Sequence, residues 1–167
     1  MNTAKDWITK LELLPHPEGG YYKEVYRANE KIDKAALPSR YSSERTFATS
    51  IYYLLKSGQF SSFHKLKSDE TWHFYKGSPI AIYLISLAGK FEKIVLGDEI
   101  DKNQLLQYTI ERETWFAAEP LEKNSYSLIG CSVAPGFEFD DFQLGKRAEL
   151  IMSFPKYSEI ILRLTNS

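Results

Sequence analysis

The chain has 167 residues, the length of one domain, and a domain of this size buries about two-thirds of the surface that its unfolded chain exposes. Its 21 Lys and Arg side chains nearly balance its 22 Asp and Glu side chains, so charge gives no reason to expect binding to nucleic acid or to an anionic membrane. The single cysteine, Cys131, excludes an intramolecular disulfide, and its apolar neighbours predict a buried, unreactive thiol.

No segment predicts a signal peptide or a membrane-spanning helix. The stretch MNTAKDWITK (residues 1–10) lacks an uninterrupted apolar core. No apolar window is long enough to cross a bilayer. We therefore expect a cytoplasmic protein.

Residues 1–15 predict an N-terminal helix. Thr3 begins a capping box, apolar residues follow at helical spacing, and Pro15 ends the pattern. The next segment, HPEGG (16–20), contains two consecutive glycines, which permit backbone angles and close approaches that a side chain would prevent. This segment predicts either a tight turn into an edge strand or a lip over the mouth of a cavity. We expect His16 at the surface or as a capping residue, not as a ligand.

Residues 20–143 predict a β-rich region, because apolar and polar residues alternate with period two in several short runs. The regular short spacing of these runs favours a sandwich or barrel over a parallel sheet. A polar segment at residues 29–45 predicts a long loop. From residue 144 to residue 165 the spacing becomes helical and predicts two short helices separated by Pro155. The expected strands are residues 21–27, 47–55, 60–66, 71–75, 80–87, 91–96, 105–110, 114–118 and 126–134.

The segment 58–77 carries the residues with the clearest chemical potential. His64 lies on the first of two neighbouring strands, and Glu70 opens the second strand after a polar corner. Period-two alternation places Ser62 on the face of His64 and Trp72 on the face of Glu70. The sequence therefore predicts an imidazole and a carboxylate on adjacent strands, beside aromatic walls.

The spacing of this segment resembles the first motif of the cupin superfamily, G-x5-H-x-H-x3-E-x6-G. Gly58, His64, Glu70 and Gly77 match this motif, whereas Leu66 stands where the second histidine would be. Three longer stretches also resemble a small family of uncharacterised cupins that are labelled predicted sugar epimerases. These stretches are LPHPEGGYY (14–22), SDETWHFYKG (68–77) and YSLIGCSVAPGFEFDDF (126–142).

The resemblance implies an all-β fold, the cupin-type double-stranded β-helix or jelly-roll β-sandwich. We expect one domain over residues 1–167, with an N-terminal helix, a jelly roll over residues 20–143 and a helical segment over residues 144–165. The resemblance also implies a homodimer, for which the strand 21–27 offers an edge.

Metal-binding cupins hold an ion with two histidines and the glutamate of the first motif and a histidine of a second motif. In this chain Leu66 cannot be a ligand, and Phe116 stands at the position of the second-motif histidine. We therefore expect no metal and no other cofactor. The alternative is a divalent metal ion at His64 and Glu70.

A histidine and a carboxylate in an aromatic pocket are the parts of a general acid–base pair. Resemblance to the cupin-fold epimerases of the rhamnose pathway, which use a histidine base and a tyrosine acid without metal, implies proton abstraction next to a sugar ketone. Those enzymes carry a lysine where this chain has Glu70. A negative charge there would destabilise an enolate, whereas burial beside Trp72 would favour the neutral acid. Candidates for the tyrosine are Tyr126, Tyr83 and Tyr22.

Two hypotheses follow. The first is a metal-independent epimerase or isomerase that binds a small polar metabolite, an activated sugar among the candidates, with His64 and Glu70 as catalytic residues. The second is a non-catalytic ligand-binding or sensing cupin that uses the same cavity. A metal-dependent enzyme is a third alternative. The expected ligand-binding residues are Tyr22, Ser62, Trp72, Trp115 and Tyr126.

Overall fold

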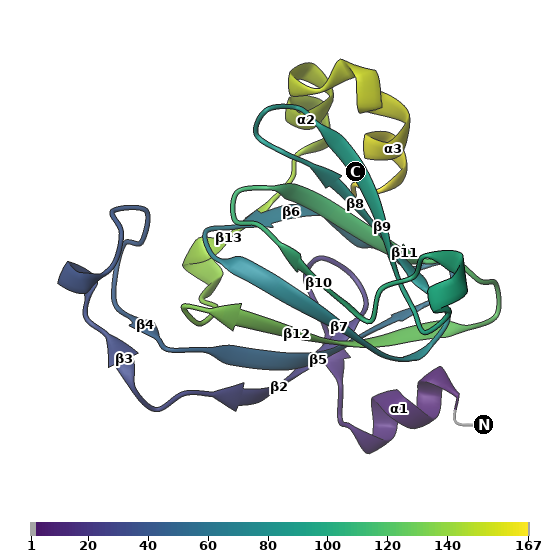
Figure 1. The fold of residues 1–167 in the computed structure, drawn as a ribbon, viewed down its shortest axis with the longest axis horizontal. Coiled ribbons are helices and arrows are strands. Elements are labelled where there is room, and N and C mark those ends of the chain that lie inside the picture. Colours follow the sequence, from purple (N-terminus) through teal and green to yellow (C-terminus); the bar gives the residue numbers. More distant parts are fainter. Residues whose placement is uncertain (1–2, 167) are drawn as a thin grey trace.

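The computed structural model describes residues 3–166 and has the all-β architecture that the sequence predicts (Figure 1). Within these residues two antiparallel sheets pack face to face, in the orders β1-β2-β5-β12-β7-β10 and β13-β6-β11-β8-β9. The first sheet contains β1 (Leu14–Pro15), β2 (Tyr21–Arg27), β5 (Thr49–Lys56), β12 (Tyr126–Ala134), β7 (Asp69–Gly77) and β10 (Gln107–Ile110). The second contains β13 (Phe142–Leu144), β6 (Ser61–Leu66), β11 (Trp115–Pro120), β8 (Ile80–Ile85) and β9 (Phe91–Leu96).

The helices lie outside the two sheets. They are α1 (Ala4–Lys10), α2 (Arg147–Ser153) and α3 (Ser158–Arg163), and the short 3-10 turns are Lys34–Ala36, Ile100–Lys102, Phe139–Asp141 and Pro155–Tyr157. The predicted capping box at Thr3 is present. The first helix ends earlier than predicted, at Lys10, because Leu14 and Pro15 pair with β2 as strand β1. No helix in the described part of the chain is long and apolar enough to cross a membrane.

The strand β8 shows how the architecture buries both faces of the second sheet. All six of its residues are buried. Ile80, Ile82 and Leu84 point into the cluster between the sheets, whereas Ala81, Tyr83 and Ile85 pack with residues of α2 and α3. Successive side chains of a strand point to opposite faces, so a continuous apolar run is what a strand covered on both sides requires.

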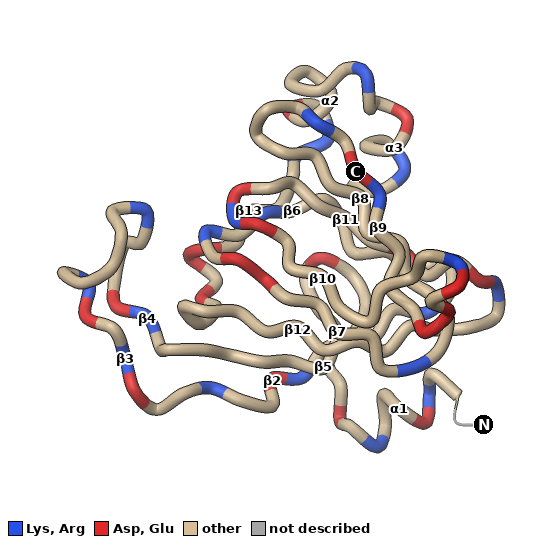
Figure 2. Tube along the Cα trace, viewed as in Figure 1, with Lys and Arg blue, Asp and Glu red and all other residues tan. Residues whose placement is uncertain are grey.

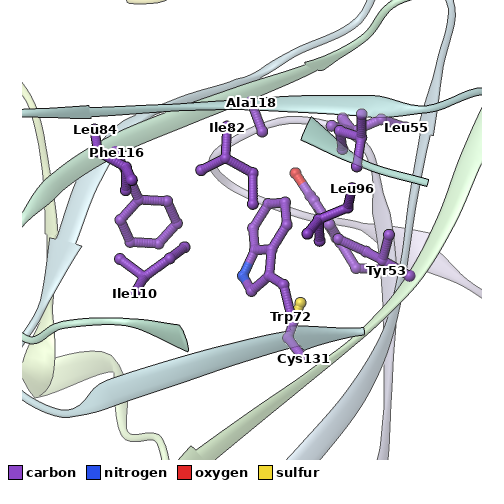
Figure 3. Close-up of a cluster of buried hydrophobic side chains, with 12 residues drawn as sticks. Tyr53, Leu55, Trp72, Ile82, Leu84, Leu96, Ile110, Phe116, Ala118 and Cys131 are labelled. Carbon is purple, nitrogen blue, oxygen red and sulfur yellow. The ribbon is translucent and has the colours of Figure 1, made fainter. Parts of the chain in front are cut away.

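The core between the sheets surrounds Trp72, which is 1% exposed (Figure 3). Its indole contacts Tyr53 and Phe116 at ring-centroid distances of 5.9 Å each. Cys131 lies on β12 directly opposite Trp72 in the register and is 2% exposed. Full burial of an aromatic side chain of this size contributes about 2–3 kcal/mol to folding.

The segment 29–45, predicted as a loop, forms an arm with a short strand pair of its own, β3 (Lys31–Ile32) and β4 (Arg45–Thr46). A buried ion pair holds the base of the arm against the sandwich. The Nε and Nη2 atoms of Arg45 each lie 2.6 Å from a carboxylate oxygen of Asp141. Figure 2 shows that basic and acidic residues both occur along this arm, as they do along the rest of the trace.

Candidate functional site

A cavity of about 270 Å³ opens between the two sheets. His64 of β6, Glu70 of β7 and Tyr22 of β2 all line it. The remaining wall comes from the HPEGG segment, from β5, from β12 and from the segment 137–142. The structure therefore brings the two predicted catalytic residues and one predicted ligand-binding residue into one space.

His64 is 2% exposed, and both of its ring nitrogens have partners. Nδ1 lies 2.8 Å from the backbone carbonyl oxygen of Ser62, and Nε2 lies 3.0 Å from Oε2 of Glu18. A carbonyl oxygen only accepts, so Nδ1 must carry a hydrogen. Nε2 and the Glu18 carboxyl therefore share one further proton, since two acceptors would repel each other at this distance.

Burial decides where that shared proton resides. Burial lowers the pKa of His64 to about 4, against the opposing hydrogen bond to Ser62. Burial also raises the pKa of Glu18, against the charge of His16. Both shifts favour the uncharged form of the pair, in which the Glu18 carboxyl donates to Nε2 of a neutral imidazole. The geometry also fits a carboxylate–imidazolium pair, and a single proton transfer interconverts the two forms.

Glu70 is a second buried carboxyl in the same cavity, 8% exposed. Burial raises its pKa to about 8, and the charge of Glu18 adds to the shift. Its Oε2 atom has no hydrogen-bond partner among residues 3–166. Glu70 is therefore a neutral acid at pH 7 with an unsatisfied oxygen, which a bound ligand could satisfy. The neighbouring Cys131 thiol has a pKa raised well above its ordinary value, because burial disfavours the thiolate.

The HPEGG segment carries the residues that the sequence analysis missed. The Ser62 N–H donates to the Glu18 carbonyl at 2.8 Å, which attaches this segment to β6. Gly19 has a φ of +120°, and a Cβ atom there would lie 2.1 Å from a backbone carbonyl oxygen. Only glycine permits this approach, which brings the Glu18 side chain to His64. The two consecutive glycines were the available signal. The segment forms the predicted tight turn into β2, and its residues His16 and Glu18 also line the cavity.

His16 was expected at the surface or as a capping residue; it does not lie at the surface, but its Nδ1 accepts a 3.3 Å hydrogen bond from the backbone N–H of Glu18, as a capping residue would. Its side chain is 8% exposed and lines the cavity. Its ring packs edge-on against Tyr22 at a centroid distance of 4.6 Å. Burial lowers its pKa, which the Glu18 charge opposes. The cavity therefore holds two imidazoles and not one.

The cavity mouth carries charged side chains. Alternation along β2 predicts that Glu24 and Arg27 face opposite sides, but both line the cavity. The register with β5 shifts between Glu24 and Tyr26, and an extra residue in a strand reverses the facing of those that follow. Arg27 donates to Glu24 at 2.9 and 3.0 Å and to Glu138 at 2.7 Å.

Four of the five predicted ligand-binding residues do not line the cavity. Ser62 was expected on the face of His64, but the pairing of β6 with β11 is irregular between Phe116 and Ala118, which breaks the alternation. Its carbonyl oxygen, not its hydroxyl, contacts the site. Trp72 fills the core between the sheets, so packing partners already cover its ring.

Trp115 and Tyr126 lie on other surfaces. Trp115 packs with the cluster beneath α2 and α3, where the amine of Lys65 lies 5.3 Å from its ring centroid. Tyr126 accepts a 2.7 Å hydrogen bond from the indole of Trp7 near α1. Each side chain is on the outer side of its sheet, where the helices and not the cavity cover it.

The donor set does not fit the metal centre of metal-binding cupins. Leu66 lines the cavity where a second histidine would stand. Phe116 packs against His64 at a ring-centroid distance of 4.0 Å. Over residues 3–166 no group of three or more His, Cys, Asp or Glu side chains is arranged to hold a metal ion. We therefore derive no chemical step through a metal.

Comparisons with known proteins agree with this architecture. A family model described as Cupin superfamily (DUF985) matches residues 5–145. The chain is 35% identical to protein SO0799 of Shewanella oneidensis, whose crystal structure aligns with a TM-score of 0.90 over 99% of both chains. A hypothetical protein from Leishmania major is 31% identical, with a TM-score of 0.89 over 99% of this chain and 100% of that one.

A third relative is the uncharacterized protein YML079W of Saccharomyces cerevisiae. It is 26% identical over 149 residues, which cover 84% of this chain and 74% of the yeast protein. The family match spans most of the chain, including both His64 and Glu70. The chain therefore belongs to the cupin superfamily, in the family described as DUF985.

Proposed function

We propose that this protein is a metal-independent enzyme that moves a proton next to a carbonyl group of a small polar metabolite, as an epimerase or isomerase does. One observation carries the proposal: the buried Glu18–His64 pair, whose Oε2 and Nε2 atoms lie 3.0 Å apart, lines a cavity. A proton shared between these two atoms could pass from one to the other. A third buried group, Glu70, supplies a neutral acid in the same cavity. Pairs of titratable groups with strongly shifted pKa values are typical of acid–base sites.

The proposed step needs only these side chains. A substrate C–H proton moves to the Glu18 carboxyl as the proton of that carboxyl passes to Nε2 of His64. The electron pair of the C–H bond becomes the enolate, whose oxygen accepts a hydrogen bond from neutral Glu70. An imidazolium and an enolate form together, so the cavity gains no net charge. Delivery of a proton to the opposite face of the same carbon completes epimerisation. Delivery to the neighbouring carbon, with transfer of its hydroxyl proton to the enolate oxygen, completes isomerisation.

The sequence analysis raised the objection that a negative charge at Glu70 would destabilise an enolate. The neutral form of Glu70 removes this objection. A carboxylate would repel the developing enolate, whereas a protonated carboxyl donates to it. A buried donor aimed at the position where charge develops stabilises the transition state more than the same group in water would. In the proposed reaction Glu70 therefore stabilises the enolate oxygen by donating a hydrogen bond to it.

A second candidate is a non-catalytic binding or sensing protein. It is favoured by the pKa of His64, about 4, because such an imidazole is a weak base at neutral pH. In this case the same cavity binds the metabolite and the unpaired Glu70 oxygen accepts or donates one hydrogen bond to it. Ligand binding would then stabilise the fold by mass action without forming a product.

Hydrogen exchange distinguishes the two candidates. The protein is incubated in D2O with a library of ketoses and other carbonyl metabolites, and mass spectrometry measures deuterium incorporation. We expect incorporation into one substrate, and Glu18→Gln should slow it by about 100-fold or more, the usual contribution of a general acid–base group.

Glu149→Gln is the matched control, because Glu149 is exposed on α2 and pairs with Lys146. It should leave the exchange unchanged. Full exchange by folded Glu18→Gln and His64→Ala variants would contradict the enzyme. Thermal stabilisation by a metabolite without any exchange would identify the second candidate.

The proposal includes a cytoplasmic homodimer. Its support is the resemblance stated above and the exposed side of β2. Within residues 3–166 this strand pairs on its outer side only at Tyr21 and Tyr22, with β1, which leaves residues 23–27 as an edge. Light scattering of the purified protein measures the assembly.

A further inference from the structure

We infer that the site takes uncharged carbonyl metabolites, such as free sugars, and excludes phosphorylated, nucleotide-linked and carboxylated ones. This inference rests on the proposed function, because it names the substrate class of the same cavity.

Arg27 is the only cationic side chain other than histidine that lines the cavity within the described residues, and it is already paired. Its Nε and one Nη donate to Glu24 at 3.0 and 2.9 Å, its other Nη donates to Glu138 at 2.7 Å, and the backbone carbonyl of Phe137 accepts at 3.1 Å. A guanidinium has five N–H donors, so one remains for a ligand. An incoming phosphate would have to displace two carboxylates to obtain the bidentate contact that it prefers.

A second hollow lies next to the cavity mouth, and its cations are likewise already paired with carboxylates. It shares Arg27, Glu138 and Phe139 with the cavity lining. Its other cation, Lys31, is held in an ion pair by Glu44. Asp140 adds a further carboxylate. Together the cavity mouth and this hollow present four carboxylates against two cations, each of which already has a carboxylate partner.

The interior of the cavity also lacks a positive charge that could bind an anion. The two imidazoles are held neutral by burial, which lowers the pKa values of His16 and His64. The interior carboxyls would repel an anion if they ionised. A neutral carbonyl or hydroxyl group meets no such penalty, and it can pair with the unsatisfied oxygen of Glu70. An activated sugar, which the sequence allowed, is therefore disfavoured by the charges around its path.

The single cysteine of the chain lets this inference be tested before any substrate is known. Cys131 lines the cavity, so its alkylation reports the entry of a small reagent. Iodoacetamide is neutral and iodoacetate is anionic, and the two are nearly equal in size. The same thiolate attacks both reagents and displaces iodide, so the ionisation of Cys131 cancels from the ratio of their rates. N-acetylcysteine gives the reference ratio in solution.

At Cys131 we expect the ratio of the iodoacetamide rate to the iodoacetate rate to be about five times the ratio measured with N-acetylcysteine. One net negative charge at the entrance would slow the anionic reagent by about this factor. High salt should reduce the excess. The double variant Glu24→Gln/Glu138→Gln leaves Arg27 unpaired and should abolish the excess. Arg27→Gln removes the cation and should increase it, and Glu149→Gln on α2 should leave it unchanged.

A wild-type ratio equal to the reference would overturn the inference and leave the proposed function intact, since the reagents would still have entered the cavity. The inference would fail in the same way if both folded entrance variants kept the wild-type ratio. Burial suppresses the Cys131 thiolate, so an Ile51→Cys variant supplies a second, less buried thiol on the cavity lining. Labelling of the urea-unfolded proteins but of neither thiol in the folded proteins would contradict an accessible cavity. That result would overturn both the inference and the proposed function.

Discussion

Replacement of Glu70 by glutamine tests whether burial holds this carboxyl in its neutral form. Its pKa is about 8 in the folded protein, against an ordinary value of 4.5. Between these two values the unfolded chain has released the proton while the folded chain still binds it. The free energy of unfolding of the wild type therefore falls as the pH rises through this window. The amide of Glu70→Gln does not titrate and has no such dependence.

The size of the effect follows from the shift. Each pH unit of the window is worth about 1.4 kcal/mol, so the wild type loses up to about 4 kcal/mol between pH 4.5 and 7.5. Below pH 4.5 the stabilities of the two proteins should differ by a constant amount, which reflects the different hydrogen bonding of acid and amide. Above it, the variant should become progressively more stable relative to the wild type.

Urea titrations at several pH values between 4 and 8 measure the difference, with the fluorescence of the three tryptophans as the signal. Glu149→Gln is the control, because its carboxyl is 58% exposed and its replacement should give a curve parallel to that of the wild type. Parallel curves for Glu70→Gln and the wild type would refute the reasoning. They would mean that Glu70 ionises normally in the folded protein and cannot act as a neutral acid at pH 7.

Two further predictions concern the scaffold of the site. Arg45→Ala should lower the free energy of unfolding by about 3–5 kcal/mol, because it leaves the buried carboxylate of Asp141 without its bidentate partner; urea denaturation measures the loss, and a loss below about 1 kcal/mol would contradict it. Gly19→Ala should destabilise the fold by at least about 2 kcal/mol, because the new Cβ meets a carbonyl oxygen at 2.1 Å. Gly58→Ala has a similar left-handed φ, +81°, but no atom within 4 Å, and should cost only about 1 kcal/mol. Equal losses in the two glycine variants would show that backbone strain and not the close approach sets the effect.

Much of the architecture could be predicted because it depends on local periodicity. Period-two runs identified the strands, and the change to helical spacing identified α2 and α3 around Pro155. The spacing between His64 and Glu70 predicted that they would meet, and both line one cavity. These features depend on neighbours in the chain, which a sequence displays directly.

The prediction failed where the strands are irregular. A shifted register in β2 turned Arg27 toward the cavity, and an irregular pairing of β6 turned the Ser62 hydroxyl away from the face of His64. A bulge adds one residue to one strand of a pair, and no local pattern in either segment marks it. Trp72, Trp115 and Tyr126 were assigned by chemical type, whereas the faces of the sheets decide what each side chain contacts.

The sequence by itself determined the fold, the strand that bears His64 and the strand that bears Glu70, because alternation and motif spacing are properties of short segments. Only the tertiary structure decided the chemistry. It brought Glu18 to within 3.0 Å of an imidazole 46 positions further along the chain, and it removed the water that would otherwise keep Glu70 charged. Protonation depends on burial and on partners distant in sequence, and these exist only once the two sheets have closed.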